Sequence, residues 1–113
     1  MKEIIEYFGV DHQRRKFAEE NLELQEAIIE YQNACRKMEG MPADYADKYL
    51  LGYRMHLIEE MADNFVLLGE FMKYFCITNK DIEKIAKYKI ARTHRKIETE
   101  KRKRDVENLI REG

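Results

Sequence analysis

Two pairs of acidic residues stand three positions apart, each inside a long stretch of helical apolar periodicity. The pairs are Glu20 with Glu23, and Glu60 with Asp63. Residues three apart are neighbours on one face of a helix, so each pair forms a two-carboxylate claw. Two claws on facing helices would gather four carboxylates, and their mutual repulsion calls for cations. Hard oxygen ligands suit Mg²⁺ or Mn²⁺, so we expect such an ion and a phosphate-bearing substrate.

The claws also lie where an unpaired charge is costly. At ~100° per residue, Glu60 falls within the apolar arc of its helix and Asp63 lies at the edge of that arc. Glu20 stands between Phe17 and Leu24 on another apolar stripe. An unpaired carboxylate there costs several kcal/mol, so basic partners or a metal must compensate. With 22 acidic residues in the chain, such spacings also arise by chance, and the inward placement on two helices is what favours metal.

The elements that must position these claws are helices. Hydrophobic residues make up 44% of the 113 residues and charged residues 38%, with only five glycines and one proline. Few breakers among many good helix formers indicate one all-α domain over residues 1–113. The net charge of −1 argues against a globally basic nucleic-acid binder. The charged start of the chain and the lack of a ~20-residue apolar run predict a cytoplasmic protein outside the membrane.

The helix boundaries are predicted from caps and breakers. Gly9 ends a short first segment, and Asp11 is a plausible N-cap for a helix that runs to about Met38. Gly40 and Pro42 then form the clearest interruption in the chain.

A second helical block covers residues 43–76, where Gly52 could divide a short helix from a long one. Its apolar residues cover a wide arc, which predicts a helix at the centre of its bundle and burial against a second copy. A turn with Asn79 or Asp81 as cap leads into the third block, which begins at Ile82 and becomes basic from about residue 92.

These residues resemble a known family, the MazG-like all-α nucleotide pyrophosphohydrolases. Residues 13–28, Gln-Arg-Arg-Lys-Phe-Ala-Glu-Glu-Asn-Leu-Glu-Leu-Gln-Glu-Ala-Ile, resemble its first motif helix, with an upstream Gln and a Glu-Glu-x-x-Glu-Leu core. Residues 59–63, Glu-Glu-Met-Ala-Asp, resemble its second motif. Residues 87–95, Lys-Tyr-Lys-Ile-Ala-Arg-Thr-His-Arg, are similar to the basic helix that closes the family's site. The resemblance covers roughly residues 8–97.

The resemblance implies a tetrahelical bundle, completed by a second copy as a homodimer or homotetramer. It also implies Mg²⁺-dependent hydrolysis of a nucleoside triphosphate, in the first place a dNTP, to the monophosphate and pyrophosphate, for sanitation of the nucleotide pool. Carried over position by position, the expected metal ligands are Glu20, Glu23, Glu60 and Asp63.

The remaining roles concern proton transfer and phosphate binding. A carboxylate near the metal could act as general base, and Glu19 is as plausible as Glu23. The resemblance implies phosphate contacts from Lys89 and Arg92, and we add Arg95 because it is close to the same motif.

Two other readings stay open. A non-catalytic helical interaction module could use the basic segment as a tail, and phosphoribosyl-ATP pyrophosphatase shares the implied fold. His56 stands one turn before Glu60 and could lie beside the site, although a surface histidine is the commoner outcome. Tyr49 and Tyr53 are among the tyrosines that could stack on a base, although aromatics at helical spacing are more often core.

Overall fold

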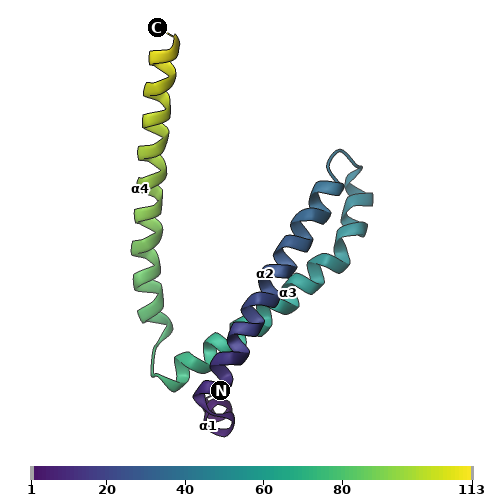
Figure 1. Ribbon diagram of the computed structural model, residues 1–113, viewed down its shortest axis with the longest axis vertical. Coiled ribbons are helices and arrows are strands. Elements are labelled where there is room, and N and C mark those ends of the chain that lie inside the picture. The colour runs from purple at the N-terminus through teal and green to yellow at the C-terminus, as the bar shows by residue number, and fades with distance from the viewer. Residues whose placement is uncertain (1, 113) are drawn as a thin grey trace. The chain divides into compact units, whose positions relative to one another are not determined.

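The computed structural model describes residues 2–112, and over that range all regular secondary structure is α-helix. Its four helices are α1 (Lys2–Phe8), α2 (Val10–Lys37), α3 (Ala43–Tyr74) and α4 (Asn79–Glu112) (Figure 1). The all-α prediction is therefore confirmed. Within residues 2–112 no helix is long and apolar enough to cross a membrane.

The chain divides into two compact units after Cys76. The first unit contains α1, α2 and α3, and the second begins at Ile77 and contains α4. The expected single domain over residues 1–113 stays a prediction.

In the first unit, α2 and α3 form an antiparallel hairpin with their lengths side by side (Figure 1). Cross-helix contacts pair Gln13 with Glu70 near one end and Glu20 with Asn64 further along, so the numbering runs in opposite directions on the two helices. The chain reverses at Gly40, whose φ of +80° is readily adopted only by glycine. The break predicted between Gly40 and Pro42 is therefore correct.

The core of the first unit is small and partly polar. Its buried apolar residues are Ile5, Ala27, Ala34 and Leu67. The two alanines let the helix backbones approach closely, while α1 packs on both long helices through Ile5. Buried Gln, Asn and Glu side chains fill the rest of the interface. A polar helix interface of this kind is typical of a bundle that builds a site between its helices.

Two of the helix boundaries expected in the first unit are wrong. Gly9, with a φ of +92°, precedes α2 in place of Asp11, which lies inside the first turn and makes no cap hydrogen bond. Its negative charge still favours that end of the helix through the macrodipole. Gly52 does not divide the second block, because α3 runs unbroken from Ala43 to Tyr74. One glycine costs a long, well-packed helix only about 1 kcal/mol.

Helix α4 begins with a reciprocal cap that the sequence analysis assigned to the wrong residue. The N–H of Asp81 donates to Thr78 Oγ1 at 3.2 Å, and the N–H of Thr78 donates to Asp81 Oδ2 at 2.9 Å. This is a capping box with Thr78 as N-cap. The hydrogen bonds from Thr78 lower the pKa of the Asp81 carboxyl. None of the described residues of α4 is buried.

Candidate metal centre

Three carboxylates from two helices converge on one point of the hairpin. Glu20 and Glu23 project from α2 and Glu60 from α3, and one oxygen of each lies within 4.8 Å of the others. We call these three residues the acidic triad. The antiparallel register brings residue 20 opposite residue 64, and therefore sets Glu60 one turn away against Glu23. The triad reproduces three of the four residues predicted as metal ligands.

The triad contains buried oxygens that lack partners. Glu60 is only 9% exposed and Glu20 is half-buried, whereas Glu23 is exposed. Within residues 2–112, Glu20 Oε2 and Glu60 Oε2 are buried atoms without a hydrogen-bond partner. A buried carboxylate oxygen is costly unless a donor or a cation satisfies it. The donor set therefore fits a hard divalent ion, which prefers carboxylate oxygens.

Burial and mutual repulsion disfavour the ionised forms of two carboxyls of the triad, those of Glu20 and Glu60. Burial raises the pKa of the Glu20 and Glu60 carboxyls, and in each case the charge of Glu23 raises the pKa further. Asp63 adds to the rise at both carboxyls, while His56 partly opposes it at Glu60. A bound cation would favour the charged forms and reverse this effect.

Asp63 is the predicted ligand that stays outside the triad. It lies one turn beyond Glu60 on α3 and is exposed. Its charge acts on both buried carboxyls, so it borders the same space and could complete the set of four. Its carboxylate oxygens are not among the atoms that converge within 4.8 Å.

Asn64 connects the backbones of the two helices at the triad. Its Nδ2 donates to the carbonyl oxygen of Glu20 at 2.9 Å and to that of Glu60 at 2.8 Å. One buried amide therefore fixes two triad residues relative to each other. Asn64 was not among the predicted site residues, although its position four residues after Glu60 places it on the same side of α3.

A second buried polar contact, also missed, lies nearer α1. Gln13 Nε2 donates to Glu70 Oε2 at 3.0 Å, and these residues are only 2% and 3% exposed. His12 Nδ1 lies 2.8 Å from Gln13 Oε1 and extends the network toward the surface. From the sequence, Gln13 was expected only as the first residue of the motif helix, with no predicted contact to Glu70. The signal for Glu70 was its place three residues after the apolar Leu67, which puts both on one face of α3.

The residues predicted for proton transfer and phosphate binding are all exposed. Glu19 lies on α2 outside the acidic triad, while Glu23 belongs to it. Lys89, Arg92 and Arg95 lie on α4 in the second unit. Their contact with phosphate stays a prediction.

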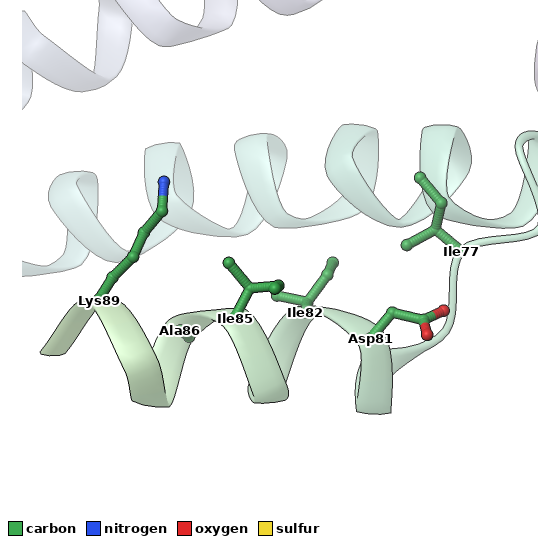
Figure 2. Close-up of a pocket in the computed structure, with 6 residues that line it drawn as sticks. All are labelled: Ile77, Asp81, Ile82, Ile85, Ala86 and Lys89. Atoms are coloured by element: carbon green, nitrogen blue, oxygen red, sulfur yellow. The ribbon is translucent and has the colours of Figure 1, made fainter. Parts of the chain in front are cut away.

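Lys89 borders a hollow along the first turns of α4. Figure 2 shows its side chain on the same face as the side chains of Ile82 and Ile85, with Asp81 toward the start of the helix. Ile77 and Ala86 complete the lining. The face is apolar between one acidic and one basic residue, so Lys89 projects from a surface that is not itself a phosphate-binding cluster.

Comparison of the chain with protein-family models, curated proteins and solved structures found no match. The resemblance to MazG-like enzymes therefore stays a prediction from residues 13–28, 59–63 and 87–95.

Proposed function

We propose that the acidic triad binds Mg²⁺, with Mn²⁺ as an alternative, and that the protein hydrolyses a nucleoside triphosphate to the monophosphate and pyrophosphate. The observation that carries this proposal is the convergence of Glu20, Glu23 and Glu60 around buried, unpartnered oxygens. A protein that gathers carboxylates in this way without a cation would lose stability for no structural gain.

The protein's own residues have distinct tasks in this proposal. The acidic triad and Asp63 hold the ion, which when bound neutralises phosphate oxygens and orients water. Glu23, the exposed member of the triad, or the neighbouring Glu19 accepts the proton of the attacking water. Lys89, Arg92 and Arg95 are the proposed phosphate contacts, because their positive charges suit phosphate oxygens.

The proposal includes a MazG-like tetrahelical bundle formed by two copies of the chain. A wide strip of apolar side chains on α3 supports it, because Phe65 is 75% exposed and Leu51 and Ile58 lie on the same side of the helix. Large apolar side chains exposed together on one face of a helix favour an interaction site there. A phosphoribosyl-ATP pyrophosphatase-like activity is a close variant, since it would need the same triad.

A second candidate function is a helical interaction module without catalysis. The observation in its favour is α4, a 34-residue helix with no buried residue in its described length and a basic segment from about residue 92. A helix that buries nothing gains little stability from packing, so a partner could be what holds it. A function of this kind would not account for the buried, unpartnered oxygens of the acidic triad.

The decisive experiment measures Mg²⁺-dependent pyrophosphate release from the eight common nucleoside triphosphates. We expect turnover in the wild type and its loss in Glu20→Gln and Glu60→Gln. Glu26→Gln, an exposed change on α2 outside the triad, serves as the matched control and should keep turnover. Turnover that is equal in all three variants, or absent from the wild type with every substrate, would overturn the hydrolase proposal. Calorimetric Mg²⁺ titration of the same variants tests the metal site separately.

A further inference from the structure

A groove runs along the hairpin beside the acidic triad, toward the turn between α2 and α3. One hollow of about 290 Å³ is lined by Glu30, Tyr49, Gly52, Tyr53 and His56. A second hollow of about 180 Å³ shares three of these residues, namely Glu30 and both tyrosines. The two hollows are neighbours along the hairpin because they share this lining, and together we call them the tyrosine groove.

The tyrosine groove lies one helix turn from the acidic triad. His56 lines the groove and stands four residues before Glu60 on the unbroken helix α3. On the opposite helix, Glu30 follows Glu23 by seven residues, which is two turns on the same edge and about 10.5 Å along the axis. An extended ligand with phosphates at the triad could therefore reach the groove with its other end.

The groove offers an aromatic surface and free space above it. The rings of Tyr49 and Tyr53 have centroids 5.8 Å apart and an interplanar angle of 39°, and Tyr53 is 38% exposed. At Gly52, between them in sequence, an added Cβ would meet no atom within 4 Å. A glycine on this edge keeps the tyrosine rings accessible, whereas most other side chains would project into the groove.

We propose that the tyrosine groove binds the planar base of the substrate, with Tyr53 as the stacking surface and Glu30 and His56 as polar partners at its rim. This inference rests on the proposed function, and it deepens that function by assigning the part of the hairpin that binds the base. Bases of any kind can stack on tyrosine, because every base has a π-face. Glu30 can accept hydrogen bonds from the amino groups of a base edge.

The test fills the groove without disturbing the core. Gly52→Leu replaces a poor helix former with a good one at an open position, so its thermal melt should be at least as high as that of the wild type. We expect KM to rise about 10-fold for a nucleoside triphosphate, as for loss of one stacked base. KM for ribose 5-triphosphate, which has no base, should not change. Tyr53→Ala should behave in the same way, and Tyr53→Phe should retain the wild-type KM.

The matched control is Ala18→Leu, which adds the same side chain to an exposed position of α2. It should leave KM unchanged for both substrates. The groove assignment is overturned if Gly52→Leu affects the two substrates equally, or affects neither.

A binding measurement separates this inference from the hydrolysis proposal. A nucleotide with a non-hydrolysable α,β-methylene bridge is titrated by calorimetry in the presence of Mg²⁺. Tight binding by the wild type and weaker binding by Gly52→Leu would support the groove even in the absence of any turnover. Equal binding by both proteins, or none by the wild type, would overturn the groove assignment whatever the turnover.

Discussion

The side-chain amide of Asn64 donates a hydrogen bond of 2.9 Å to the backbone carbonyl of Glu20, on the opposite helix of the hairpin. The same nitrogen donates to the carbonyl of Glu60 on its own helix at 2.8 Å. These two carbonyls belong to residues whose carboxylates converge in the triad. Asn64 thus sets the distance and the register between two backbones, while leaving the carboxylates free for a ligand.

Asn64→Ala should weaken Mg²⁺ binding, although Asn64 is not itself a member of the acidic triad. Loss of both hydrogen bonds should lower the free energy of unfolding by about 1–3 kcal/mol. Because residues that orient ligands affect metal affinity, we expect Mg²⁺ affinity to fall about 10-fold. Calorimetric titration and thermal melts measure the two effects. The exposed Asn21→Ala is the control. An Asn64→Ala protein with a lower melt and an unchanged Mg²⁺ affinity would contradict the positioning role.

The stability of the metal-free protein should fall as pH rises above the ordinary glutamate range. The folded-state pKa of Glu20 and of Glu60 is raised above the ordinary 4.5. The folded protein therefore holds these protons more tightly than the unfolded chain. Their contribution to stability is complete below pH 4.5 and is lost as pH rises through the raised values. We expect a higher melting temperature near pH 5 than near pH 7.5.

Added Mg²⁺ should change the sign of this pH dependence. The ion competes with protons for the same oxygens, so it stabilises more at pH 7.5 than at pH 5. Melts at both pH values, with and without Mg²⁺, give the comparison. In the Glu20→Gln/Glu60→Gln double variant the pH slope and the Mg²⁺ effect should both shrink. A wild-type Mg²⁺ effect that is the same at the two pH values would argue against binding at the triad.

The sequence predicted the parts of the site that depend on local geometry. The spacing of three between Glu20 and Glu23 holds on any helix, and Gly40 with Pro42 is sufficient to indicate the turn that makes the two claws face each other. Asn64 and Glu70 were missed because their roles depend on partners 44 and 57 residues away. Cross-helix register determines such pairs, and periodicity within one helix carries no information about register.

Local signals also competed with each other at the helix ends. Thr78, Asn79 and Asp81 are all good capping residues, and only the reciprocal hydrogen bonds distinguish the cap at Thr78 from the N3 position of Asp81. The wide apolar arc of α3 was expected at the centre of a bundle. Leu67 is buried against α2, but Phe65 faces outward. One helix partner can cover only one side of such an arc.

The buried contact between Gln13 and Glu70 should contribute to stability without contributing to metal binding. Gln13→Ala leaves a carboxylate that is only 3% exposed without its donor, which should cost about 2 kcal/mol. Glu70→Gln removes the buried charge. In that background Gln13→Ala should therefore lower the free energy of unfolding by less than it does in the wild type. A double-mutant cycle measures the difference between the two backgrounds. Mg²⁺ affinity should stay at the wild-type value in all of these variants. Gln25→Ala, at an exposed position of α2, is the control, and equal destabilisation by both alanine variants would refute the contact.

The outward side of α3 should mediate self-association. Leu51, Ile58 and Phe65 recur at intervals of seven and are 58%, 44% and 75% exposed, which is the spacing of a helix–helix seam. Ile58 lies roughly 160° around α3 from Glu60, so a partner on this seam would leave the triad open. We expect a dimer or tetramer at micromolar concentration by sedimentation velocity, and a monomer for Phe65→Glu. Leu22→Glu, an equally drastic change at a 62% exposed position of α2, should preserve the oligomer.

Because the seam and the triad lie on different sides of α3, the Phe65→Glu monomer should bind Mg²⁺ as the wild type does. A wild-type protein that sediments as a monomer at these concentrations would rule out the seam.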